Sequence, residues 1–166
     1  MAKYISILTN GGKQVNPTIV KTIINADGTE IAKEQIKAEV NAKLGLTENT
    51  NEDIEISEEN LKAILEGMRG VTSESGGTAY SIFRNFNIKI GGKTGSAQAE
   101  EATNAWFAGF APYDNPEIAI IVVIENGGSG SLACYAARDI IAQYFGMNEK
   151  QVEENITAIP YNEIEN

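Results

Sequence analysis

The chain has 166 residues, of which 42% are hydrophobic and 22% are charged, values close to the average for soluble globular domains. Its formal net charge of -10 argues against nucleic acid as a partner, because an acidic surface repels phosphate backbones. The sequence contains no histidine and one cysteine, Cys134. This excludes histidine-dependent catalysis, intrachain disulfides and imidazole or thiolate metal sites, and we expect neither a metal nor a cofactor.

The first half of the chain is expected to be mainly helical. Apolar residues at helical spacing, bounded by capping residues, predict three helices: residues 1–9, 29–44 and 57–70. Between and after them we expect less regular segments: a β-branched extended run over 18–24, a turn at 25–28, a polar loop over 46–55 and a glycine-containing loop over 71–79. Ser57 would cap the third helix, whose buried stripe would comprise Leu61, Ile64, Leu65 and Met68.

The second half changes to short strands, predicted over residues 86–92, 93–98, 105–111 and 118–125. The last of these is a continuous apolar run, which is typical of a central strand covered on both faces. A turn over residues 112–116 would join the last two strands as a hairpin. A closing helix over residues 131–145 carries four apolar residues along one side: Leu132, Ala136, Ile140 and Tyr144. Helices followed by a hairpin-built sheet predict an α+β domain, an antiparallel sheet flanked by helices.

The segment Gly91 to Gln98, with the sequence GGKTGSAQ, is the most informative about function. Its Gly-Lys-Thr matches the end of a phosphate-binding loop, but Asn87 stands where that loop requires its first glycine, so we reject this interpretation. Lys-Thr-Gly on a strand beside a cleft is the alternative, since a cation and two hydroxyls suit a carboxylate. By itself, a three-residue match is more often a lysine and a threonine on a solvated strand.

Further segments in the same order extend the match: NGGK at 10–13, PTIVK at 17–21, GM at 67–68, GTA at 77–79, WFAGFAP at 106–112, PEI at 116–118 and ENG at 125–127. This order resembles the transpeptidase domain of penicillin-binding proteins, serine enzymes related in fold to β-lactamases. The resemblance covers most of residues 1–145, and Gln98 favours the monofunctional class B proteins. We therefore expect residues 1–146 to be the C-terminal portion of a transpeptidase domain and residues 147–166 to be an acidic tail.

The resemblance implies a role for each residue of the Lys-Thr-Gly strand. Lys93 would orient substrate and supply positive charge near the nucleophile. The hydroxyls of Thr94 and Ser96 would bind the carboxylate of the substrate or of a β-lactam, and the backbone N–H of Ser96 would be one of two oxyanion-hole donors. Gly95 would permit close approach of the substrate. Trp106, on the neighbouring strand, is a candidate substrate contact, although we favour a core aromatic packed between sheet and helix.

Two family motifs are missing. None of the eight serines is followed three residues later by lysine, and no Ser-x-Asn occurs. Both motifs lie N-terminal to the matched region in the family, so we expect a fragment of a membrane-anchored, extracytoplasmic enzyme that cross-links peptidoglycan stem peptides in elongation, division or sporulation. We expect the chain itself to be soluble, because it has no apolar run of membrane-spanning length and no signal-peptide profile.

By itself the chain would be inactive, with β-lactams binding only the complete domain. Three alternatives remain open: a non-catalytic module that binds peptidoglycan or a partner, a serine β-lactamase or β-lactam-sensor domain, and a scaffold without a site. A family sheet that lacks its N-terminal strands would expose apolar surface, so we also expect the chain to self-associate. The loop at Gly76, Gly77 and Thr78 could border the cleft, but we favour a simple turn.

Overall fold

The computed structural model describes residues 1–17, 19–45, 53–99 and 102–147. In this part of the chain, strands β1 (Gly91–Gln98), β2 (Thr103–Ala111) and β3 (Ile118–Ile124) form one antiparallel sheet in the order β1-β2-β3. The expected α+β class and the hairpin between the last two strands are confirmed. The tail over residues 148–166 and residues 46–52 of the predicted loop lie outside the described residues.

Two strand predictions were wrong in part. The expected strands 86–92 and 93–98 are a single strand that begins at Gly91, because residues 86–90 run irregularly out of the short helix α4 (Tyr80–Phe83). The apolar strand β3 is covered on both faces, by helices α1 (Ala2–Thr9) and α5 (Gly130–Tyr144), but it lies at an edge of the described sheet. Its apolar character therefore reflects the two helices and not a central position.

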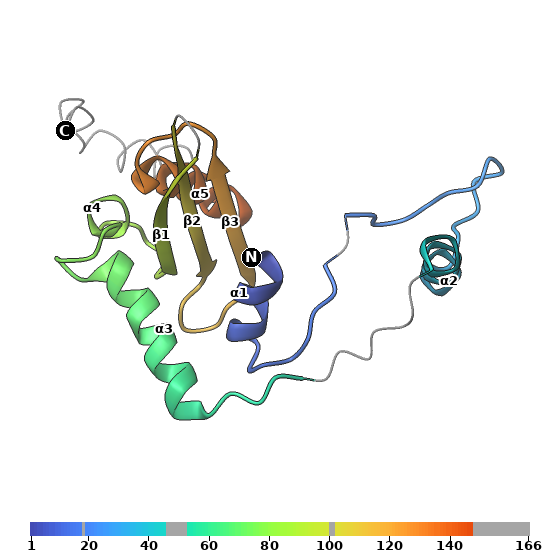
Figure 1. Cartoon of the computed structure of the whole chain (residues 1–166), viewed down its shortest axis with the longest axis horizontal. Helices are drawn as coiled ribbons and strands as arrows, with labels where there is room; N and C mark the ends of the chain where they lie inside the picture. Colours follow the sequence, from blue (N-terminus) through green and yellow to red (C-terminus); the bar gives the residue numbers. More distant parts are fainter. Residues whose placement is uncertain (18, 46–52, 100–101, 148–166) are drawn as a thin grey trace.

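Each face of the sheet carries its own core. On one face, Phe107 of β2 packs with Cys134 and Ile141 of α5, and Figure 1 shows α5 behind the three strands. On the other face, Phe110 packs with Ile5 of α1 and with Met68 of α3 (Glu58–Ser73). Because successive side chains of a strand point to opposite faces, β2 supplies both cores from alternate residues.

The start of β1 is built from glycines so that aromatic rings of β2 can lie across it. A Cβ at Gly91 would overlap the ring of Phe110, and a Cβ at Gly92 would overlap the ring of Phe107. Both rings are fully buried. The absence of side chains on these two residues therefore allows the edge strand to close against both cores.

Helix boundaries agree with the sequence in outline. The predicted helix over 1–9 is α1, and Ser57 caps α3 by accepting a hydrogen bond from the Asn60 N–H at 3.3 Å. Helix α3 runs to Ser73, three residues beyond the predicted end at Gly70. Of its predicted buried stripe only Met68 is buried, whereas Leu61 and Leu65 are partly buried and Ile64 is exposed. In α5 the predicted side, with Leu132 and Tyr144 exposed by 40% and 56%, faces outward. Small buried residues such as Ala137 face the sheet instead and let α5 pack closely.

The described residues between Gly12 and Ile54, which are residues 13–17, 19–45 and 53, lie outside the body of the fold and form one excursion. Helix α2 (Lys33–Leu44) lies in it, apart from the sheet and with no buried residue (Figure 1). The predicted surface helix is therefore confirmed, but it begins at Lys33 and not at residue 29, because Glu30 pairs with Ile24 in a bridge. The expected extended run over 18–24 does not form a sheet strand, because in its described part only Ile24 pairs, by an isolated bridge to Glu30 across the predicted turn. The Ile54 N–H donates to the Gly12 carbonyl at 2.9 Å and closes the excursion.

None of the helices in the described ranges is long and apolar enough to cross a membrane.

A buried hydroxyl joins α3 to the start of β1. Thr72 is 3% exposed, and its Oγ1 donates to the carbonyl of Ile90 at 2.5 Å. We expect Thr72→Val to lower the free energy of unfolding by about 1–3 kcal/mol, because a buried carbonyl loses its donor. The matched control is Ser73→Ala, whose exposed hydroxyl bonds the Arg69 carbonyl; it should change stability by less than about 0.5 kcal/mol. Urea unfolding measures both, and equal effects would contradict the prediction.

Candidate functional site

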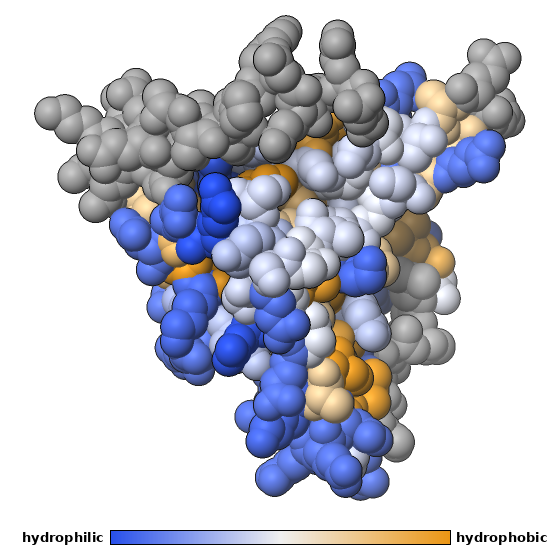
Figure 2. All heavy atoms as spheres, turned by 90° about the vertical axis from the view of Figure 1, so that its left-hand side faces the viewer, coloured by the Kyte–Doolittle hydropathy of each residue, from blue (hydrophilic) through white to orange (hydrophobic). Residues whose placement is uncertain are grey.

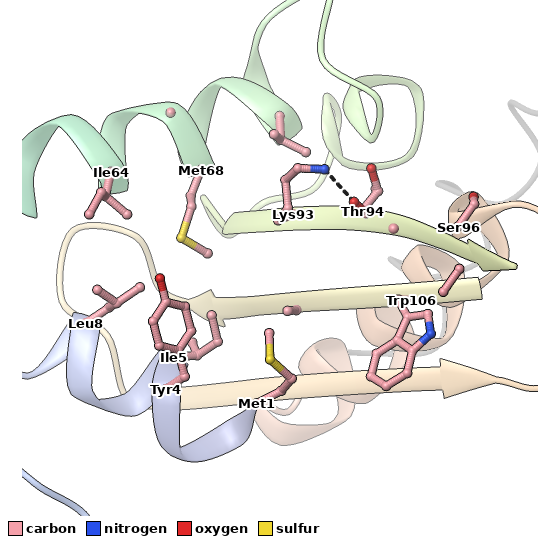
Figure 3. Close-up of a pocket in the computed structure, with 15 residues that line it drawn as sticks. Met1, Tyr4, Ile5, Leu8, Ile64, Met68, Lys93, Thr94, Ser96 and Trp106 are labelled. Carbon is pink, nitrogen blue, oxygen red and sulfur yellow. Dashed lines mark hydrogen bonds between the residues drawn. The ribbon is translucent and has the colours of Figure 1, made fainter. Parts of the chain in front are cut away.

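A cleft of about 650 Å³ lies between helices α1 and α3 and strands β1 and β2. Figure 3 shows its walls, with Met1, Tyr4, Ile5 and Leu8 from α1 and its N-terminal end, Ile64 and Met68 from α3, and Lys93, Thr94, Ser96 and Trp106 from the strands. The lining is mainly apolar, and Lys93 is its single charged residue among the described parts of the chain. The cleft therefore combines an apolar wall with one cation at the sheet edge.

Strand β1 divides its residues between the two faces of the sheet. Lys93 and Gly95 lie opposite Ala108 and Trp106 of β2, so all four share the face toward the cleft. Thr94 and Ser96 alternate with them along the strand and also line the cleft; the hydroxyl of Thr94 bonds to that of Thr78, and the hydroxyl of Ser96 accepts from the Gly130 N–H. Since Lys93 lies within a strand and does not begin a helix, the rejection of a phosphate-binding loop is confirmed.

Lys93 is exposed, and its Nζ donates to the carbonyl of the next residue, Thr94, at 2.5 Å (Figure 3). The same side chain borders a second, shallower depression formed by the end of α3 and the loop from Gly76 to Thr78, which also includes Glu74. The ammonium group is thus held along the strand at the junction of two depressions. Within the described ranges no three carboxylates or thiols gather in a way that could hold a metal ion.

The loop at Gly76, Gly77 and Thr78 is a turn, as predicted, but it also touches the site. Oγ1 of Thr78 lies 2.6 Å from Oγ1 of Thr94. Sequence reasoning missed this contact, because the two threonines lie on different elements. The Gly-Thr-Ala match at 77–79 was the available signal.

The N-terminus of α5 lies directly behind the middle of β1. The Gly130 N–H donates to Oγ of Ser96 at 3.1 Å. A Cβ at Gly130 would lie 2.8 Å from the Gly95 carbonyl oxygen, closer than real Cβ contacts. A glycine at this position therefore lets the helix end approach the strand closely enough to bond Ser96.

Trp106 is not the core aromatic that we favoured. It is half-buried, lies beside Gly95 and lines the cleft (Figure 3). Its Nε1 is buried and has no hydrogen-bond partner among the described residues. The reason is that successive side chains of a strand point to opposite faces of the sheet. Phe107 points to the core with α5, so Trp106 points to the cleft.

Cys134 is not placed to act as a nucleophile. Its side chain is fully buried beneath the sheet, and its thiol donates to the Gly130 carbonyl at 3.4 Å. Burial raises the pKa of this thiol to about 12, so the reactive thiolate is absent near neutral pH.

Comparison with known proteins agrees with this geometry. Residues 1–142 match the family model for the penicillin binding protein transpeptidase domain. The chain belongs to this family. It is 29% identical to the peptidoglycan D,D-transpeptidase MrdA of Haemophilus influenzae, over 93% of this chain and 24% of that protein. It is also 29% identical to penicillin-binding protein 2B of Streptococcus pneumoniae, over 87% of this chain and 22% of that protein.

Solved structures give the same result. The Pseudomonas aeruginosa protein PBP2, solved in complex with WCK 5153, superposes with a TM-score of 0.70 and 29% identity, covering 90% of this chain and 29% of that one. The resemblance to class B penicillin-binding proteins is therefore confirmed. The chain spans about a quarter of the length of the curated relatives named above.

Alanine substitutions at Gly130 and at Gly95, which lie close together, should differ in their effect on stability. We expect Gly130→Ala to lower the free energy of unfolding by about 1–3 kcal/mol, because its methyl group would collide with the backbone of Gly95. Gly95→Ala should change it by less than about 0.5 kcal/mol, because its Cβ would lie 3.4 Å from Cβ of Trp106, an ordinary contact. Urea unfolding of both variants checks this. A larger loss for Gly95→Ala would show that Gly95 is required for packing.

Proposed function

We propose that this chain is the part of a peptidoglycan D,D-transpeptidase that carries the Lys-Thr-Gly strand and binds the C-terminal carboxylate of a stem peptide. The observation that carries the proposal is the arrangement on one edge strand of a family member: Lys93 on the cleft face and the hydroxyls of Thr94 and Ser96 beside it. An edge strand can accept an extended peptide along its free side, and a carboxylate is recognised by a cation and hydroxyl donors.

The structure supports a separate role for each residue. Lys93 would supply positive charge at the mouth of the cleft, and Thr94 and Ser96 would donate hydrogen bonds to the carboxylate. The backbone N–H of Ser96 would stabilise the oxyanion of the acyl-transfer step, a contribution typically about 3 kcal/mol for one donor. Among the described residues, a Cβ at residue 95 would meet only an ordinary contact with Cβ of Trp106 at 3.4 Å, so the glycine there is better explained by the approach of a ligand. Trp106 would form the apolar floor beside it.

The proposal assigns the chemistry to the complete transpeptidase. No serine of these 166 residues has a lysine three positions later, so the chain alone would not form an acyl-enzyme. In the complete enzyme the serine hydroxyl would attack the peptide carbonyl while a lysine takes its proton, and the strand described above would hold the substrate. The peptide C–N bond would break, and the C-terminal residue would leave as a free amine that takes up this proton. Such an enzyme would act outside the cytoplasm, anchored in the bacterial membrane, and β-lactams would occupy the same strand.

Ligand titration tests the carboxylate site on this chain. We expect acetyl-D-Ala-D-Ala, at millimolar concentrations, to shift the amide resonances of residues 93–96 in a saturable way. The same peptide with a C-terminal amide should bind at least about tenfold more weakly, because the charge-assisted hydrogen bonds are lost. Two-dimensional NMR of the labelled chain measures both dissociation constants.

The matched control is Lys89→Ala, because Lys89 is also an exposed lysine but pairs with Asp114 away from the cleft, at 3.0 Å. It should leave binding unchanged, whereas Lys93→Ala should weaken it.

Intact-mass measurement after incubation with benzylpenicillin should show no covalent adduct. Equal affinity for the acid and the amide would contradict the carboxylate site, and a penicillin adduct would contradict the assignment of the nucleophile to the rest of the enzyme.

We also propose that the chain self-associates through the apolar cleft face. Tyr4 and Ile64 line the cleft and are 53% and 40% exposed. The side of the molecule toward α3 and α4 shows mainly hydrophilic and intermediate side chains, with hydrophobic areas between them (Figure 2). Contiguous apolar surface of this kind favours association in water.

Sedimentation velocity at increasing concentration tests this association. We expect a growing dimer or larger species for the unaltered chain and a monomer for the double variant Tyr4→Glu, Ile64→Glu. The control Val40→Glu, Leu44→Glu adds the same charge at exposed positions on α2 and should leave association unchanged. A monomer at every concentration, or an equal effect of the two double variants, would refute the proposal.

A further inference from the structure

Both hydroxyls of the proposed carboxylate site are hydrogen-bonded to groups outside the Lys-Thr-Gly motif. For Ser96 the partner is the Gly130 N–H, 3.1 Å from Oγ. A backbone amide can only donate, so Oγ of Ser96 is the acceptor in this contact. The proton of the Ser96 hydroxyl therefore points elsewhere and remains available to a ligand.

For Thr94 the partner is a second hydroxyl, Oγ1 of Thr78, at 2.6 Å. A hydroxyl carries one proton and two lone pairs, so either threonine can be the donor in this contact. If Thr94 donates to Thr78, its proton is used within the protein. If Thr78 donates, the proton of Thr94 is free, as it is for Ser96.

Thr78 is held firmly enough to fix such a contact. A Cβ at the preceding residue, Gly77, would overlap the carbonyl oxygens of Gly70 and Val71, so only glycine lets the loop pack onto the end of α3. The following residue, Ala79, is fully buried, and its N–H donates to the Val71 carbonyl at 3.0 Å. The backbone on both sides of Thr78 is thus anchored to α3.

We propose that Thr78 is a positioning residue for carboxylate recognition: it donates to Oγ1 of Thr94 and thereby turns the Thr94 proton toward the bound carboxylate. A carboxylate accepts only, so a bound ligand requires Thr94 to donate to it. The contact between the threonines can then keep a proton only if Thr78 supplies it. This inference rests on the proposed carboxylate site.

The position of Lys93 supports the same arrangement. Lys93 borders both the cleft and the depression that contains Thr78, so its ammonium group and the Thr78–Thr94 pair lie near one another. A ligand carboxylate drawn to Lys93 would meet the Thr94 hydroxyl with its orientation already set. Pre-orientation of a donor reduces the entropy lost on binding.

A double-mutant cycle on the titration with acetyl-D-Ala-D-Ala tests the inference. Thr78→Val should weaken binding of the acid roughly threefold to tenfold, the range for one neutral hydrogen bond, and leave binding of the amide peptide unchanged. Thr78→Ser, which keeps the hydroxyl, should restore the affinity. In a Thr94→Val background, Thr78→Val should have no further effect, because the hydroxyl that it orients is gone.

The control Ser73→Ala removes an exposed hydroxyl at the end of α3, and this variant should bind acetyl-D-Ala-D-Ala like the unaltered chain. Unchanged affinity in Thr78→Val would overturn the inference while leaving the carboxylate site intact. A further loss in the Thr94→Val background would also overturn it, because Thr78 would then contact the ligand directly. If the unaltered chain itself does not distinguish acid from amide, the proposed function fails and the inference fails with it.

Discussion

The packing of two phenylalanine rings across two glycines is the constraint on which the site depends. Phe110 and Phe107 of β2 point to opposite faces of the sheet, and each ring occupies the space beside a residue of β1 that has no side chain. The start of β1 is therefore locked to both cores at once. Since a strand cannot shift its register without moving every side chain to the other face, this lock fixes Lys93 on the cleft side.

The same packing explains how the edge strand β1 can expose its backbone and small side chains and still keep a fixed position in the sheet. Beyond the glycine pair, β1 contributes little to either core, and its position is maintained from behind by Gly130 and from the α3 end by Thr72. Strand β2, helix α5 and helix α3 thus hold β1 in place, and its free side stays open. Binding sites gain precision when the scaffold, and not the ligand, fixes the geometry of the recognition groups.

The sequence was sufficient for the parts of the site that are continuous along the chain. The placement of Lys-Thr-Gly on a strand, the hairpin and the Ser57 cap depend on adjacent residues, and these were predicted correctly, although the start of that strand was not. The contact between Thr78 and Thr94 depends on how α3 meets β1, which no local pattern specifies. The face of Trp106 was missed because β2 is apolar on both sides, so hydrophobicity did not reveal which alternate residues face the cleft.

Two further errors have a common physical cause. The continuous apolar run of β3 indicated burial on both faces correctly, but hydrophobicity does not tell a central strand from an edge strand when helices cover both sides. In α5 the predicted side with Leu132 and Tyr144 faces outward, while Ala133, Cys134, Ala137 and Ile141 are buried against the sheet. Both sides of this helix carry apolar residues, so hydrophobicity alone does not tell which side packs.

The excursion between Gly12 and Ile54 is closed where these two residues are hydrogen-bonded, and this closure separates the residues of the excursion from the site. The Gly12 and Ile54 backbones are hydrogen-bonded, and Gln14 adds a bond to the Asp53 carboxylate at 2.8 Å, so the two arms leave and rejoin the body side by side. The entropy lost on closing a loop grows only with the logarithm of its length. Segments of quite different length and composition could therefore be inserted at this closure, which gives the fold a place to acquire new surface while its cleft stays unchanged.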